Sequence, residues 1–354
     1  METKKYRFDE VTINFDKKRI PLSSAQREKR QGTFRYYGAQ GVIDHVDDYI
    51  YDGTYLLIAE DGENLKSKKQ NIAQVVDGQF WVNNHAHIVQ GNEQCDTRFL
   101  CYLINSMDLS GYVTGSAQPK LSQANLNAIT LSLPTLVEQK RIVEYLYMLD
   151  QKIDVNRQIN DNLQQQAQAI YSSMFIDNPD PAWSHGHLSD LITVKYGKDH
   201  KKLADGIYPV YGSGGIMRYV ERPLYNKESV LIPRKGTLNN VMYVNQPFWS
   251  VDTMFYTEMK LPNVAKFVYH FVKAKDLASM NAGSAVPSMT TDILNAMEVV
   301  IPSASALEEF ESLVAPMYEA MEANDVQSKA LSQIRDTLLP KLMSGEIDVS
   351  DVQL

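Results

Sequence analysis

The sequence predicts a chain built from two copies of one α/β unit, each followed by a long helix, and three observations support this. Residues 135–175 contain no proline or glycine, and their apolar positions recur at alternating steps of four and three, which is the spacing of a coiled coil. The same spacing returns 168 positions later, near the C-terminus. Similar motifs precede both helices, so we expect an internal duplication that presents two globular modules on a pseudo-twofold frame.

The first long helix could run unbroken for about 40 residues, or roughly 60 Å, which is too long for an ordinary core helix. Two of the coiled-coil core positions in this helix are polar, and both have polar counterparts in the second copy: Asn324 for Asn156 and Ser328 for Asn160. Polar seam residues cost stability but fix register, so the matched layer favours pairing of the two helices over two unrelated amphipathic helices. The predicted core of the pair is Leu146, Leu149, Ile153, Asn156, Leu163, Val314, Met317, Met321, Asn324 and Leu331.

The repeat extends through the segments before each helix. YYGAQGVIDHV at 36–46 resembles VYGSGGIMRYV at 210–220, and residues 115–134 align with 283–302 without a gap. The offset changes from 174 to 168 between these motifs, so one deletion of six residues reconciles the copies. The predicted division is 1–134 for the first module, 135–178 for the central helix, 179–302 for the second module and 303–354 for the C-terminal helix and tail.

Composition and charge narrow the class of protein. The chain has 354 residues, 44% of them hydrophobic, which is enough for two globular cores. The net charge of −8 comes mainly from residues 303–354, which carry 3 basic and 10 acidic side chains. The two modules are therefore nearly neutral. This charge fits a protein that reads bases while other subunits help to hold it on DNA, and it fits a non-specific polycation less well. With no apolar signal or membrane segment and only two cysteines, we expect a cytoplasmic protein without disulfides or membrane contact.

Polar and basic side chains recur at equivalent turns and strand ends in both copies. Such side chains bind phosphates or base edges, although solvated surface, strand caps and ordinary turn chemistry give the same pattern. The DNA-binding candidates in the first copy are Lys17, Lys18, Arg19, Arg35, Tyr37, Gln40, Lys68, Lys69, Asn83, Asn84, Ser116, Gln118 and Lys120. Those in the second copy are Lys198, Lys201, Lys202, Tyr211, Ser213, Arg234, Lys235, Thr253, Ser284 and Ser288.

Taken together, these motifs resemble the specificity subunit of Type I restriction-modification systems. Each repeat ends in G-S-A-x-P, a short helix and L-P or I-P, and the first continues into an E-Q-K-R-I-V helix containing L-D-x-K-I. The resemblance covers the whole chain and is strongest at 115–154, while LLPKLMSGEIDV at 338–349 looks like the usual ending of that family. The second helix departs from the pattern, with Leu307 and Glu308 in place of the Glu138 and Gln139 opening.

This resemblance implies two target-recognition domains of mixed α/β fold, held by two long helices that form an antiparallel coiled coil. Each domain would read one half of a bipartite, asymmetric site in double-stranded DNA, and the helix pair would set the unspecific spacer. Two copies of a methylation subunit, which uses S-adenosylmethionine, and a restriction subunit, which uses ATP and Mg²⁺, would dock around the helices. Tyr145, Tyr147 and residues 164–168 are plausible contacts for them.

The chain itself is expected to be non-catalytic and to hold neither a cofactor nor a metal. It has no phosphate-binding G-x-G-x-x-G or G-x-x-x-x-G-K-S/T motif, and the nearest segment to the N/D-P-P-Y/F site of adenine methyltransferases is NPDP at 178–181. His85, His87, Cys95 and Cys101 do not have zinc-site spacing, and the second copy contains no cysteine. The alternatives are an enzyme acting alone and a standalone sequence-specific DNA-binding protein or repressor.

Overall fold

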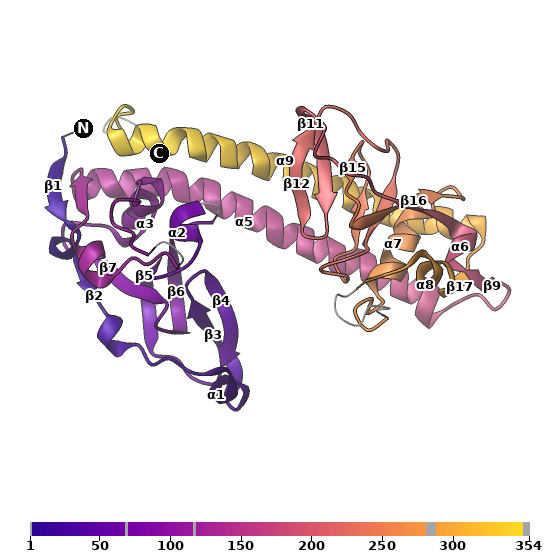
Figure 1. Cartoon of the computed structure of the whole chain (residues 1–354), viewed down its shortest axis with the longest axis horizontal. Helices are drawn as coiled ribbons and strands as arrows, with labels where there is room; N and C mark the ends of the chain where they lie inside the picture. Colours follow the sequence, from indigo (N-terminus) through magenta and orange to yellow (C-terminus); the bar gives the residue numbers. More distant parts are fainter. Residues whose placement is uncertain (1, 68–69, 116–117, 281–287, 350–354) are drawn as a thin grey trace. The chain divides into compact units, whose positions relative to one another are not determined.

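The structure, a computed structural model, describes residues 2–67, 70–115, 118–280 and 288–349 (Figure 1). The chain divides into two compact units: unit 1 is Met1–Val155 with Val326–Leu354, and unit 2 is Asn156–Asp325. The two long helices, α5 (Leu136–Ser172) and α9 (Ala304–Ser344), each contribute to both units. The four-part division expected from the sequence stays a prediction. In the described ranges, no helix is both long and apolar enough to cross a membrane.

Unit 1 is built on a six-stranded sheet with the order β2-β7-β5-β6-β3-β4. Its neighbouring strands are antiparallel except for β3 and β6, which are parallel. The strands are β2 (Thr12–Asn14), β3 (Gln31–Gly38), β4 (Gly41–Val46), β5 (Tyr51–Ala59), β6 (Ala73–Val82) and β7 (Ala86–Gly91). A separate antiparallel pair joins β1 (Lys4–Arg7) to β8 (Thr130–Leu133). The short helices are η1 (Phe8–Glu10), η2 (Asp16–Lys18), α1 (Ser24–Glu28), α2 (Asn64–Ser67), α3 (Thr97–Ser106) and α4 (Gln123–Asn127).

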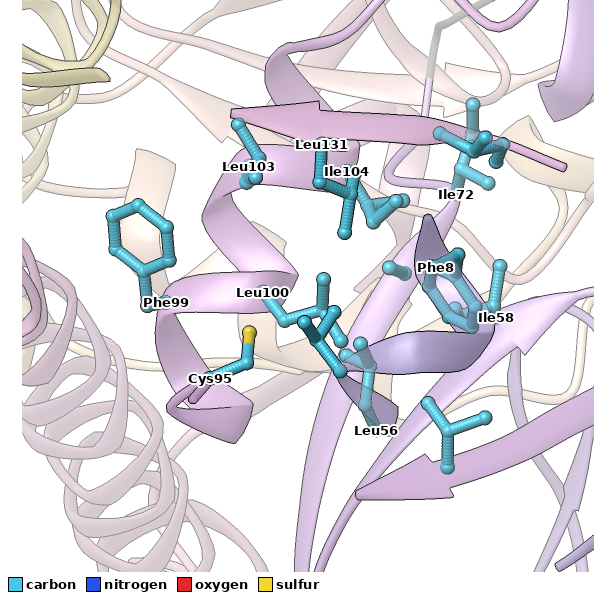
Figure 2. Close-up of a cluster of buried hydrophobic side chains, with 14 of the residues drawn as sticks. Phe8, Leu56, Ile58, Ile72, Cys95, Phe99, Leu100, Leu103, Ile104 and Leu131 are labelled. Carbon is cyan, nitrogen blue, oxygen red and sulfur yellow. The ribbon is translucent and has the colours of Figure 1, made fainter. Parts of the chain in front are cut away.

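The main core of unit 1 lies between α3 and the sheet. Leu100 and Ile104 project from α3 toward Leu56 and Ile58 of β5 (Figure 2). The Asp96 carboxylate caps α3 by accepting hydrogen bonds from the first backbone N–H groups of the helix. The apolar face of α3 therefore anchors the strand that ends at the candidate site.

Unit 2 repeats the same connections with a divided sheet. Its strands form the orders β10-β16-β13-β14 and β12-β11-β15, together with the pair β9–β17. The parallel pair β11–β15 corresponds to β3–β6. The strands are β9 (Ser184–His187), β10 (Ile192–Tyr196), β11 (Asp205–Gly212), β12 (Gly215–Val220), β13 (Ser229–Pro233), β14 (Met242–Val244), β15 (Trp249–Ser250), β16 (Met254–Met259) and β17 (Glu298–Ile301). The helices are α6 (Leu188–Leu191), α7 (Ala265–Lys273) and α8 (Thr291–Asn295), with a π-helical turn at Ser173–Asp177.

The two long helices are paired antiparallel, as the predicted fold class requires. In unit 2, Asn156 Nδ2 donates to the backbone oxygen of Asn324 over 3.3 Å, and Asn160 Nδ2 donates to that of Met321 over 3.1 Å. The Asn324 amide returns a 2.8 Å bond to Asn160 Oδ1. Across these bonds the residue number rises along α5 and falls along α9, so the two helices run antiparallel. Asn156 therefore meets its own counterpart in the repeat, which a twofold relation between the helices demands at its axis.

The helix pair is also joined in unit 1. Arg335 Nη1 of α9 donates to Asp150 Oδ1 of α5 over 2.7 Å, and Leu342 packs in the same cluster as Ile142 and Leu146. Of the ten residues predicted to form the core of the pair, three are buried: Leu146, Asn156 and Val314. The other seven are half-buried: Leu149, Ile153, Leu163, Met317, Met321, Asn324 and Leu331. Two helices alone cannot surround the side chains between them, so these seven side chains remain partly exposed.

Candidate nucleic-acid interface

In unit 1, several separate segments meet where β5 ends. The backbone N–H of Glu60, just past β5, donates to the His85 oxygen in the β6–β7 turn over 2.9 Å. The N–H of Leu121 donates to the Glu60 oxygen over 2.8 Å, which ties in the loop that ends at Lys120. The N–H of Asn83 donates to the Tyr37 oxygen over 3.0 Å, which ties in the β3–β4 hairpin. Three segments that carry predicted DNA-binding residues thereby meet at the end of β5: the β6–β7 turn, the loop that ends at Lys120 and the β3–β4 hairpin.

Charged side chains link the same segments. The Glu60 carboxylate lies 2.9 Å from Arg19 Nη1 and 3.2 Å from Lys120 Nζ. Burial alone would raise the pKa of Glu60, but these partners and the nearby His87 hold it below its ordinary value. Arg19 also donates to the backbone oxygen of Ala86 over 2.9 Å. Arg19, predicted to meet phosphates, is therefore engaged in holding these loops together, whereas the Lys120 side chain is exposed.

A buried histidine supports this arrangement from beneath. His87 Nδ1 lies 2.6 Å from Asp16 Oδ2, and His87 Nε2 lies 2.8 Å from the Leu121 oxygen. Each ring nitrogen of His87 therefore faces an oxygen that accepts hydrogen bonds, a carboxylate on one side and a backbone carbonyl on the other. Burial would raise the pKa of Asp16, but hydrogen bonds from the His87 ring and the Ile88 N–H keep it lowered. The pair clamps the strand ends that present the candidate side chains.

Unit 2 assembles the equivalent segments around the end of β13. The backbone N–H of Arg234 donates to the Thr253 oxygen over 2.9 Å, and the N–H of Met289 donates to the Arg234 oxygen over 2.9 Å. Lys235 forms an isolated β-bridge with Ser288. Asn240 Nδ2 donates to the Ser213 oxygen in the β11–β12 turn over 2.8 Å. The same hairpin, strand end, turn and loop therefore come together in both units.

The side chains on these matching frames differ in charge and chemistry. At the offset of 168, Phe255 stands at the position of His87. The cross-strand partner of Phe255 is Tyr196, whereas His87 bonds Asp16. These two rings make an edge-to-face contact at 5.1 Å between centroids, and the Arg234 guanidinium lies 5.4 Å from the Tyr196 ring. At the offset of 174, Arg234 stands at the position of Glu60. One unit therefore carries an ion-pair network where the other carries an aromatic and cationic group.

The predicted DNA-binding residues fall into four groups by their placement. The exposed residues are Lys17, Lys18, Gln40, Asn84, Gln118, Lys120, Lys198, Lys201, Lys202 and Lys235. The half-buried residues are Arg19, Arg35, Ser213, Arg234, Thr253 and Ser288. Tyr37, Asn83 and Tyr211 are buried. Lys68, Lys69, Ser116 and Ser284 lie outside the described residues.

Sequence reasoning missed the acidic side chains of this surface. Glu60 and Asp61 hold basic neighbours, and the Asp61 carboxylate lies 2.7 Å from His85 Nδ1. The signal that could have found them was the alignment of Glu60 and Asp61 with Arg234 and Lys235. Carboxylates bind neither phosphates nor hydrogen-bond acceptors on bases, so a pattern of basic residues and amides does not include them. Within the described ranges, no group of three or more His, Cys, Asp or Glu side chains could hold a metal ion.

Comparison with known proteins gives one consistent family. The family model described as "Type I restriction modification DNA specificity domain" matches residues 2–165 and 182–310. A Haemophilus influenzae protein named as the specificity subunit S.HindORF215P of a type I restriction enzyme is 26% identical, with 94% of each chain covered. The MjaIX specificity subunit of Methanocaldococcus jannaschii is 24% identical over 72% of this chain and 70% of its own.

A solved structure supports the fold separately. The S subunit of a Type I restriction-modification system from M. genitalium superposes with a TM-score of 0.64 at 16% identity. The match covers 97% of this chain and 96% of that one. At this level of identity, the superposition bears on the fold and not on individual side chains.

Proposed function

This chain belongs to the Type I restriction-modification DNA specificity family, and on that premise we propose that it is the subunit that selects the DNA sequence. Each unit reads one half of a bipartite, asymmetric site in double-stranded DNA. The antiparallel helix pair sets the unspecific spacer between the halves. It also provides the surface on which two methylation subunits and a restriction subunit dock.

The observation that carries this proposal is the repeated frame with unlike side chains. Both units bring the same hairpin, strand end, turn and loop together by backbone hydrogen bonds, which leaves their side chains to vary independently. Glu60 with its ion pairs in one unit and Arg234 beside Tyr196 in the other present different donors and acceptors. Two unlike surfaces of this kind suit two unlike half-sites, because base edges are distinguished by their pattern of donors and acceptors.

The chemistry is assigned to the partner subunits. In this proposal the methylation subunit binds S-adenosylmethionine and the restriction subunit uses ATP and Mg²⁺, while this chain supplies position and sequence. A net charge of −8 gives it little non-specific attraction for phosphates. The isolated chain should therefore bind DNA weakly and gain affinity when the methylation subunit adds its own contacts.

A gel-shift titration tests this assignment. The target is first identified by methylome sequencing of a host that carries the intact system. A duplex with that target and a duplex with a scrambled half-site are then titrated with the full chain, alone and with the methylation subunit. We expect sequence-specific binding only with the partner present. Tight specific binding by the chain alone would instead favour a standalone repressor, and no specific binding in either case would refute the proposal.

A further inference from the structure

Each unit exposes two consecutive aliphatic side chains just after its Gly-rich hairpin turn. In the β3–β4 hairpin, Val42 is 43% exposed and Ile43 is 52% exposed. In the β11–β12 hairpin, Ile216 is 49% exposed and Met217 is 61% exposed. These are the same positions of the repeat, at the offset of 174. Single exposed apolar residues are common on protein surfaces, but a repeated adjacent pair requires a reason.

A β-bulge at the same place in both hairpins produces this exposure. Tyr36 pairs with Asp44, and the next residue, Tyr37, pairs with Val42, so Ile43 is the extra residue. In unit 2, Val210 pairs with Arg218 and Tyr211 with Ile216, so Met217 is the extra residue. Neighbouring side chains of a regular strand point to opposite faces. The bulge re-aims one of them, and bulges of this kind commonly adjoin functional sites.

Glycine on the neighbouring strand makes room for the bulged side chain. A Cβ at Gly38 would lie 3.1 Å from Ile43 Cγ2, and one at Gly212 would lie 2.5 Å from Met217 Sδ. The aliphatic side chain therefore lies across a bare stretch of backbone. The turn itself uses Gly41 at φ +135° and Gly215 at φ +108°, a conformation that other residues rarely adopt. The sequence of each copy thus specifies the turn, the bulge and the space it needs.

We propose that each hairpin inserts its aliphatic pair between base pairs of the bound duplex as a wedge. This inference rests on the proposed function and names an apolar contact within it. The hairpins are tied into the polar frame, since the Asn83 N–H bonds the Tyr37 oxygen and the Asn240 amide bonds the Ser213 oxygen. When those loops approach the base edges, the hairpin therefore lies against the same duplex.

The chemistry of the pair selects the base stack over the phosphates. Val42, Ile43, Ile216 and Met217 offer no donor for a phosphate oxygen, whereas aliphatic side chains are the wedges by which proteins part base steps. The pair is aliphatic in both units although their polar residues differ. The two units read unlike half-sites, so a contact that both units share does not suit the readout of one particular base. It suits a step that both half-sites require, such as local unstacking.

The test uses the full chain with its methylation subunit and a duplex that carries the methylome-defined target. 2-Aminopurine replaces single bases along the first half-site, because its fluorescence rises when the base is unstacked. The variant is Val42→Ser with Ile43→Ser. The matched control is Ile13→Ser, since Ile13 is 50% exposed on β2 at the opposite edge of the same sheet. Circular dichroism before and after heating confirms that each variant is folded.

We expect the wild-type complex to raise fluorescence at one step and the double variant to abolish that rise. The variant should bind about tenfold more weakly, as the loss of two apolar contacts implies, with an unchanged dependence on salt because no phosphate contact is removed. The Ile13→Ser control should behave as wild type.

Two outcomes would overturn the wedge while leaving the proposed function intact. One is specific binding by the wild type without any fluorescence change. The other is a photo-crosslinker at position 43 that labels protein instead of DNA in the complex, which would show that a second protein surface covers the hairpin. Failure of the wild-type complex to bind its target would instead refute the proposed function.

Discussion

A buried histidine should make the stability of unit 2 depend on pH. His270 of α7 is fully buried, and its two nitrogens face both long helices. Nδ1 lies 2.8 Å from Gln168 Oε1 of α5, and Nε2 lies 3.0 Å from the Tyr318 hydroxyl of α9. A neutral ring that donates to Gln168 and accepts from Tyr318 satisfies both contacts. Burial, with a smaller contribution from Lys273, lowers the pKa of His270 to about 4.

The sign of the effect follows from which state binds the proton. An unfolded histidine titrates at a pKa of about 6.5, so between about pH 6.5 and pH 4 the unfolded chain takes up a proton that the folded chain refuses. Stability is therefore complete above about pH 6.5 and declines as the pH falls. With the folded pKa at about 4, the loss at pH 5 is on the order of 2 kcal/mol, rising to about 3 kcal/mol at lower pH.

Hydrogen exchange of peptides from α7 at a series of pH values, corrected for intrinsic exchange, measures this loss locally. His270→Gln is the control, because its amide can donate and accept but does not titrate. The wild type should lose about 2 kcal/mol of opening free energy relative to the variant between about pH 8 and pH 5. Parallel pH curves for the two proteins would show that His270 binds its proton equally well in the folded and unfolded states, which contradicts the lowered pKa.

Three further predictions concern the frame and the DNA surface. Asn160→Ala removes the amide that bonds Met321, Asn324 and Asp325 and should cost about 1–3 kcal/mol in chemical denaturation; an unchanged midpoint would contradict this role. Lys235→Ala should lower the salt slope of target binding by about 1 if Lys235 meets a phosphate, and an identical slope would exclude that contact. Inserting one heptad into both long helices should lengthen the unspecific spacer by roughly 10 Å, or about three base pairs, and an unaltered spacer in the methylome would show that the helices are not the ruler.

The helix pair and the repeat could be predicted because their signals are long or duplicated. Seam periodicity over some 40 residues and the offset of 168 predicted two paired helices, and Asn156 lies against Asn324 as that pairing requires. Ser122 and Thr290, residue types that commonly cap helices, each accept a hydrogen bond from a backbone N–H three residues on. The periodicity within each helix and the duplication of the whole unit are both visible in a single sequence.

The engagement of particular side chains could not be predicted in this way. Arg19 contacts Glu60, 41 residues further along the chain, and His87 contacts Asp16, 71 residues away. Contacts at that separation leave no periodic pattern in a single sequence. Tyr37 and Tyr211 directly precede the Gly-rich turns, but each ring packs edge-on against a phenylalanine, Phe80 or Phe248. Their burial arises from the closing of the sheet, which no local motif records.

Exchange of one unit shows whether each of the two like units reads one half of the target. Residues 1–134 are replaced by the corresponding segment of a relative that modifies a different sequence, and the methylome of a host carrying the hybrid is sequenced. We expect one half of the bipartite site to change while the other half and the spacer length are kept. A change in both halves would contradict it.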